Sequence, residues 1–138
     1  ISFLENLKKQ KVIANITVHQ VHFLENLELI KRIIKEKLVY GIGVSVSNIT
    51  EELLQALKEV PNSVCHVING IWNEKTAEKM AGNNLKVLIL GYKELRRGND
   101  YLSVYDKAVK ENQKWLFDNL RNLFKKFDIK DKNCIVLK

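Results

Sequence analysis

Short runs of apolar residues alternate along the chain with longer segments whose apolar residues recur at helical spacing. Short apolar runs are typical of strands, and a 3.6-residue period is typical of amphipathic helices. The predicted strands span 12–18, 40–46, 63–68, 87–90 and 134–137, and the predicted helices span 22–36, 51–60, 73–81 and 103–127. A repeat of roughly 22–28 residues over the first four strands indicates βαβ units and a parallel sheet.

The helical patterns also predict a core and several helix ends. Either Asn48 or Thr50 can cap the second predicted helix, Asn73 can cap the third, and Gly82 can end it. The residues expected to be buried are Phe23, Leu24, Leu27, Ile30, Ile33, Ile34, Leu53, Leu54, Leu57, Ala108, Leu116, Leu120, Leu123 and Phe127. Alternating strands and helices of this kind predict an α/β fold built from parallel (βα) units.

The first two predicted strands have one aliphatic face and one small, polar face. Ile42, Val44 and Val46 alternate with Gly43, Ser45 and Ser47, and strand 12–18 alternates in the same way. Parallel strands covered on both faces are usually aliphatic throughout. Solvent exposure of the polar face is one explanation. We favour the other, a partial TIM-like barrel in which this face lines a cavity, because a helix follows each strand.

The first four predicted strands all have polar residues or glycine at their carboxyl ends. Parallel sheets bind ligands at this edge. The residues concerned are Thr17 and His19, Ser45 and Ser47, Asn69 and Gly70, and Gly91 and Lys93. Glycine lets a ligand approach the backbone, and asparagine offers both a donor and an acceptor. Lys93 and Arg97 are candidates for binding an anion. Tyr92 is either a packed aromatic side chain or part of the site.

Composition narrows the classes of function. The 138 residues carry a net charge of +7, but the lysines lie largely on polar helix faces and no basic patch is interleaved with aromatic residues. Nucleic acid is therefore not an expected partner. No apolar run has the length of a membrane span. Cys65 and Cys134 lie far apart within apolar runs, so we expect free, buried thiols and a cytoplasmic protein.

A metal site is not expected. His19 and His22 have a spacing that zinc sites use, but a third and a fourth ligand are not evident. Cys65 and His66 are adjacent in a strand and therefore point to opposite faces. The phosphate-binding loops, the serine-hydrolase elbow and the H-E-x-x-H motif are absent, and Glu94 is the only acid near the strand ends.

Three segments together resemble the middle and later part of a radical S-adenosylmethionine (SAM) domain, and they are most similar to phage-type and uncharacterised clostridial members. They are NITVHQ (15–20), YGIGVSVSN (40–48) and LILGYKELRRG (88–98). The last matches the family's aliphatic-x-Y-K-x-x-G-R-G strand end, with Arg96 where a glycine is usual. The resemblance covers most of residues 12–100.

The resemblance implies a partial (βα) barrel that carries a [4Fe-4S] cluster. The family's N-x-T-x-H strand is matched by Asn15, Thr17 and His19. Its cluster is bound by a C-x3-C-x2-C motif after the first strand. That motif is missing here, and Cys65 and Cys134 do not replace it.

By the same resemblance, polar groups at the ends of the middle strands bind the methionyl and ribose parts of SAM. Carried over to this chain, that role falls on Thr17, His19, Ser45, Ser47 and Asn69. Tyr92 and Lys93 would face the adenine or the substrate, and Arg97 would contact a substrate or an anion. The family cleaves the sulfonium reductively to a 5′-deoxyadenosyl radical, and the cofactor rather than the protein supplies the difficult chemistry.

We therefore expect residues 1–138 to form a single domain that is a fragment of a larger barrel and inactive alone. SAM and the [4Fe-4S] cluster are expected to be bound by the full-length protein, and neither by this segment alone. Its expected partners are the missing N-terminal part of the same polypeptide and copies of itself, bound through open sheet edges. Two alternatives remain. One is a stand-alone α/β binding or regulatory domain with a closed sheet and no redox chemistry. The other is a different (βα) barrel enzyme that uses Lys93 as a Schiff-base or anion-binding group.

The fragment interpretation predicts a C-x3-C-x2-C motif in the polypeptide upstream of Ile1. Sequencing the gene beyond this end of the chain checks the prediction. A gene without the motif would contradict membership of the radical SAM family.

Overall fold

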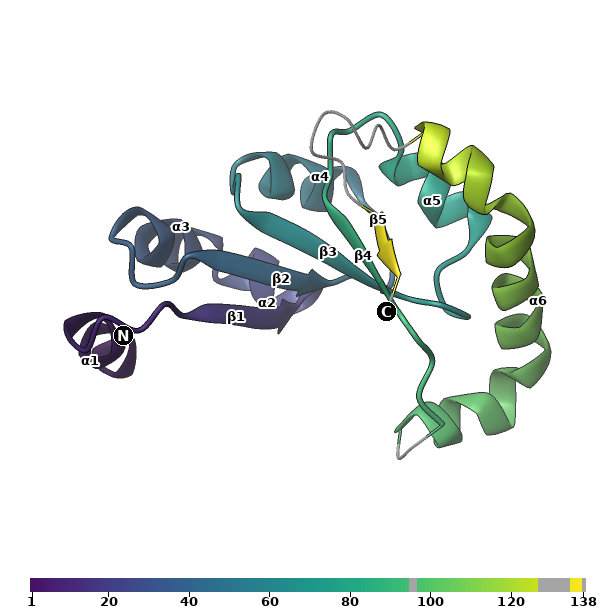
Figure 1. Cartoon of the computed structure of the whole chain (residues 1–138), viewed down its shortest axis with the longest axis horizontal. Coiled ribbons are helices and arrows are strands. Elements are labelled where there is room, and N and C mark those ends of the chain that lie inside the picture. The colour runs from purple at the N-terminus through teal and green to yellow at the C-terminus, as the bar shows by residue number, and fades with distance from the viewer. Residues whose placement is uncertain (95–96, 127–134, 138) are drawn as a thin grey trace.

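A single parallel sheet organises the chain in the computed structural model, which describes residues 1–94, 97–126 and 135–137. The described strands are β1 (Asn15–His19), β2 (Gly41–Ser45), β3 (Ser63–Ile68), β4 (Val87–Leu90) and β5 (Ile135–Leu137). The described helices are α1 (Ser2–Lys9), α2 (Gln20–Glu25), α3 (Leu27–Lys35), α4 (Glu51–Lys58), α5 (Glu74–Met80) and α6 (Arg97–Lys126). The predicted α/β fold with parallel strands is confirmed (Figure 1).

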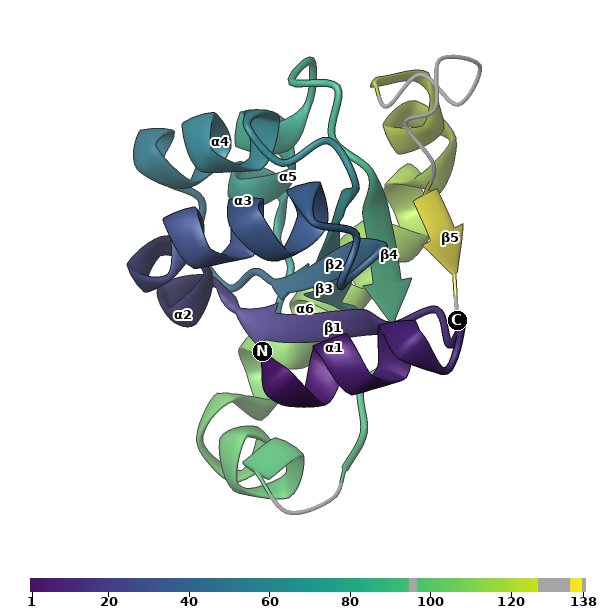
Figure 2. The same ribbon diagram turned by 90° about the vertical axis from the view of Figure 1, so that its left-hand side faces the viewer.

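The strands pair in the order in which they occur along the chain, β1-β2-β3-β4-β5. Every pairing is parallel, and β1 and β5 form the two edges of the described sheet. The sheet is therefore open: no described strand joins β1 to β5. Figures 1 and 2 show α2, α3, α4 and α5 together on one side of it and α1 beside β1.

One face of the sheet is buried against the helices. Val44, Val67 and Ile89 are almost completely buried on this face and belong to one hydrophobic cluster. Helices α2 to α6 all contribute to the same cluster, through Phe23, Ile30, Leu53, Leu57, Met80, Leu116 and Leu123. Side chains on the opposite face, which we call the open face, are exposed or half-buried. The predicted split into an aliphatic and a polar face is therefore real.

The predicted helix 22–36 is two helices, because the chain breaks at Asn26. The backbone of Asn26 is not helical (φ −116°, ψ 23°). The carbonyl of His22 accepts from the side-chain amide of Asn26 at 2.9 Å and from its backbone N–H at 3.1 Å, so the side chain adds a second bond at the end of α2. The apolar spacing continues across the break, and for that reason periodicity alone did not reveal it.

The last helix differs from its prediction in extent and in phase. It begins at Arg97, earlier than predicted, and it is kinked at Tyr105 (φ −118°, ψ 24°). Ala108, which was expected to be buried, is exposed, and its neighbour Val109 is buried instead. Val109 lies seven residues before the buried Leu116, so the two share one face of the helix. Phe127 lies outside the described residues.

The N-terminal helix α1 was not predicted, and it shortens the first strand. After α1 the chain turns through Lys11 at φ 59°, and the amide of Val12 donates to the carbonyl of Leu7. Residues 12–14 therefore precede β1 rather than belong to it. Strands 63–68 and 87–90 and the caps at Thr50 and Asn73 are confirmed. The fifth strand is confirmed over 135–137, and Cys134 lies outside the described residues.

Phe23 is fully buried between the sheet and the helices, so its truncation is expected to destabilise the fold. Phe23→Ala should lower the free energy of unfolding by about 3–5 kcal/mol, through lost burial and the remaining cavity. The matched control is Phe117→Ala, because Phe117 is 79% exposed on α6. This substitution should change the free energy of unfolding by no more than about 0.5 kcal/mol. Urea unfolding measures both variants, and equal losses would contradict this core.

Candidate functional site

The strand register brings polar side chains of the open face into rows. His19 is paired with Ser45, and Ser45 is paired with His66, so these three residues lie side by side across β1, β2 and β3. Thr17 and Gly43 form the preceding row. The sequence left the direction of His66 undecided. The structure places it on the open face, opposite the buried Cys65.

The imidazole of His66 occupies the space above Gly43. A Cβ atom at Gly43 would lie 2.6 Å from Cε1 of His66 and 2.8 Å from Oγ1 of Thr17. These distances are shorter than van der Waals contact. The absence of a side chain at Gly43 therefore allows His66 and Thr17 to approach each other, which is a close-approach role for glycine inside a strand.

His19 and Gln20 fix the geometry where β1 enters α2. Nδ1 of His19 accepts a hydrogen bond from the backbone N–H of Val21 at 3.3 Å, so this histidine caps α2. The side-chain carbonyl of Gln20 accepts from the backbone N–H groups of Ser47 and Asn48 at 2.8 and 3.1 Å. Gln20 therefore joins the ends of β1 and β2. Sequence reasoning missed it, although a polar residue directly after a strand was a signal.

A small cavity of about 170 Å³ lies at the carboxyl ends of the first strands. We call it the histidine–serine cavity. Its lining residues are His19, Ser45, Val46, Ser47, His66, Ile68, Ile71 and Leu90. Three predicted site residues, His19, Ser45 and Ser47, thus meet at one place, as the convergence of strand ends predicts.

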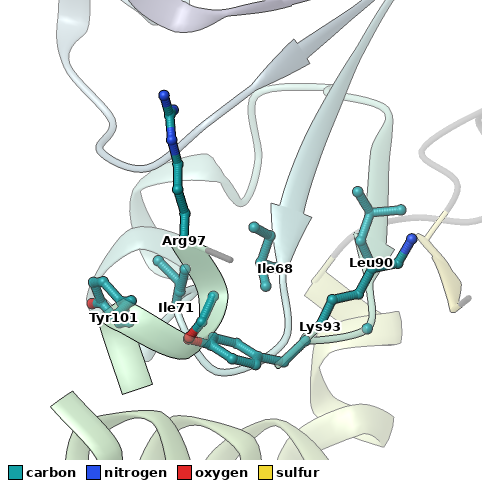
Figure 3. A pocket seen from close by; sticks show the side chains of 9 residues that line it. Ile68, Ile71, Leu90, Lys93, Arg97 and Tyr101 are labelled. Carbon is teal, nitrogen blue, oxygen red and sulfur yellow. The ribbon is translucent and has the colours of Figure 1, made fainter. Parts of the chain in front are cut away.

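A larger cavity of about 700 Å³ adjoins it beside the end of β4. We call it the strand-end cavity (Figure 3). Its lining residues are Ile68, Ile71, Leu90, Gly91, Tyr92, Lys93, Arg97, Gly98 and Tyr101. The two cavities share Ile68, Ile71 and Leu90, which form a common apolar wall. The structure therefore brings Tyr92, Lys93 and Arg97 together, next to the histidine–serine cavity.

The loop between β4 and α6 is held by a close backbone approach. The hydroxyl of Tyr92 donates a hydrogen bond to the carbonyl oxygen of Gly98. A Cβ atom at Gly98 would lie only 1.9 Å from the carbonyl oxygen of Lys93, so this position requires glycine. Partial burial, together with the nearby Tyr101 and Glu94, raises the pKa of Tyr92. Its hydroxyl is therefore protonated at neutral pH and remains a donor.

Two predicted site residues do not line either cavity. Thr17 lies one row away from the histidine–serine cavity, beside His66. Asn69 follows the alternation of Val67 towards the helix-covered side, and its backbone N–H donates to the carbonyl of Leu90 at 2.8 Å. Its side-chain oxygen is buried and has no hydrogen-bond partner within the described part of the chain. A direct ligand contact through Asn69 would require this side chain to turn.

The described residues do not fit an iron–sulfur cluster. Among residues 1–94, 97–126 and 135–137, no group of three His, Cys, Asp or Glu side chains could hold a metal ion. Cys65 is a free thiol buried on the helix-covered face, away from the strand-end cavity. Burial raises the pKa of this thiol to about 12, which keeps it protonated. Cys134 lies outside the described residues.

Comparison with protein-family models, with curated proteins and with solved structures gives no match to this chain. None of the described helices is both long and apolar enough to cross a bilayer.

The buried Cys65 thiol is expected to resist alkylation in the native protein. Its pKa of about 12, against an ordinary value of 9.0, leaves about 1,000-fold less thiolate at pH 8 than in the unfolded chain. Iodoacetamide labelling followed by mass spectrometry, in a Cys134→Ser background, measures Cys65 alone. Labelling should be fast in guanidinium and very slow in native buffer. Equal rates in the two conditions would contradict the burial.

Proposed function

We propose that this chain is the later part of a radical SAM barrel and that it binds SAM at the carboxyl ends of its strands. The observation that carries the proposal is the convergence of His19, Ser45 and Ser47 on one cavity, beside a second cavity that includes Tyr92, Lys93 and Arg97. The resemblance assigns these residues to the cofactor and the substrate. Their meeting at one edge is what such an assignment requires.

The strand order supports the partial TIM-like barrel. In doubly wound sheets the strand order reverses at a switch point, and helices cover both faces. In (βα) barrels, consecutive strands are neighbours and the helices form an outer layer. Here β1 to β5 are neighbours in chain order, and the helices share one buried cluster on one face. The open face then corresponds to the inside of a barrel.

The residues present are compatible with SAM. Ligand sites commonly have volumes of about 300–1,000 Å³, and the strand-end cavity has about 700 Å³. Hydroxyl and imidazole groups of the histidine–serine cavity suit ribose hydroxyls and the methionyl ammonium and carboxylate. The shared apolar wall suits a flat adenine ring. When bound, SAM supplies the sulfonium bond that members of the family cleave.

The described residues offer no cluster ligands, so in this proposal the reducing group belongs to the N-terminal part of the same polypeptide. That part would also lie against β1, whose outer edge pairs with no described strand. An unpaired edge favours association, either with this upstream part or with a second copy of the chain. The free Cys65 thiol is in keeping with the cytoplasm as the proposed compartment, and nucleic acid is not a proposed partner.

The rival interpretation is a stand-alone binding or regulatory domain without redox chemistry. Two adjoining cavities would suffice for such a role. It predicts a closed sheet and a stable monomer, whereas the described sheet has edges at β1 and β5. A ligand other than SAM in the histidine–serine cavity would favour this interpretation.

Binding of SAM should depend on the histidine–serine cavity. Ser45→Ala removes one hydroxyl from its lining and should weaken binding by about 2- to 10-fold, the value of one lost hydrogen bond. Ser103→Ala is the matched control, because this exposed serine of α6 lines neither cavity. Equilibrium dialysis of labelled SAM against the full-length polypeptide carrying each substitution measures the affinities.

Absence of saturable binding at millimolar SAM would contradict the proposal, and so would equal affinities of the two serine variants. In the full-length polypeptide, anaerobic reconstitution and a search for 5′-deoxyadenosine test the chemistry separately from binding.

A further inference from the structure

The strand-end cavity has positive charge without an acidic counterpart. Lys93 and Arg97 both line it, and none of its lining residues is acidic. Like many other lysines and arginines of the chain, neither cation forms an ion pair with a described residue. Two cations at one cavity without acids favour an anionic group in the space between them.

The rest of the lining is apolar and aromatic. Ile68, Ile71 and Leu90 form one wall, and Tyr101 belongs to the first turns of α6. In Figure 3, Ile68 lies between Arg97 on one side and Lys93 with Leu90 on the other, and Ile71 lies below Arg97, near Tyr101. Walls of this kind suit a flat, apolar ring better than a sugar, because a sugar leaves its hydroxyls without partners.

Tyr92 also lines the cavity, and its hydroxyl is neutral. Its hydroxyl donates to the carbonyl of Gly98 and stays protonated at neutral pH. The nearest described acid in sequence is Glu94, which is exposed and does not line the cavity. A ligand cation would therefore meet two positive side chains in the lining, with the carboxylate of Glu94 outside it.

We infer that the strand-end cavity binds an organic anion made of a flat apolar ring and one carboxylate or phosphate group. Arg97, with its planar guanidinium, holds the anionic group by paired hydrogen bonds. Lys93 adds a second positive charge from the other side. The ring lies on Ile68 and Ile71. This assigns a chemical class to a molecule that occupies the cavity. Its ring would use the same apolar wall that the proposed function gives to the adenine of SAM, so the two ligands would compete there.

Two probes with the same ring and different charge test the inference. The carboxylate 2-naphthoate should bind at least about tenfold more tightly than the neutral 2-naphthamide, because only the former meets the two cations. Isothermal titration calorimetry at low ionic strength measures both affinities with the full 138-residue chain. The preference should shrink as salt is added.

Charge-removing variants locate the site. Arg97→Gln should abolish most of the preference for naphthoate, and Lys93→Gln should reduce it. The matched control is Arg121→Gln, which removes the same charge from an exposed position of α6 that does not line the cavity. Far-UV circular dichroism confirms that each variant is folded. Since Lys93 and Arg97 are both exposed, neither substitution opens the core.

Three results would overturn the inference. They are no binding of naphthoate at millimolar concentration, equal affinity for the two probes, and equal loss in Arg97→Gln and Arg121→Gln. A further titration uses 2-naphthyl phosphate. If this compound binds more tightly than 2-naphthoate, phosphate is the preferred anionic group. These results are independent of the Ser45→Ala measurement, so either proposal can fail while the other stands.

Discussion

Burial of the aliphatic face of the sheet against α2 to α6 is the interaction on which the rest of the structure depends. Val44, Val67 and Ile89 are buried there in one cluster with Phe23 and Leu53. Because side chains alternate along a strand, a slip of one residue in any strand would place polar groups in this core. The register is therefore strongly specified. The same register aligns His19, Ser45 and His66 on the open face, so the site follows from the packing on the other side of the sheet.

Two close approaches to glycine then shape the open face and its edge. Gly43 makes room for the ring of His66 beside Thr17, and Gly98 lets the chain after β4 fold back against Lys93. The first shapes the polar row, and the second positions the start of α6, from which Arg97 reaches the strand-end cavity. The resulting site has two ends: the histidine–serine cavity is polar, and the strand-end cavity is cationic and apolar. The proposed roles in SAM binding and in anion binding use these two ends respectively.

Much of the architecture could be predicted from local patterns. Strands 63–68 and 87–90 have the predicted bounds. Thr50 caps α4 and Asn73 caps α5, as predicted. The convergence of His19, Ser45 and Ser47 was also predictable, because parallel strands end at one edge. The break at Asn26 was not, since apolar spacing persists through it and only the non-helical backbone of Asn26 separates α2 from α3.

By itself, the sequence determined the alternation of strands and helices, the aliphatic and polar faces, and which residues stand at the strand ends. These properties depend on spacing within one element, and spacing is local. Only the tertiary structure decided that His66 lies in one row with His19 and Ser45, and that the side-chain oxygen of Asn69 is buried without a partner among the described residues. Each of these depends on contacts between segments far apart in the chain.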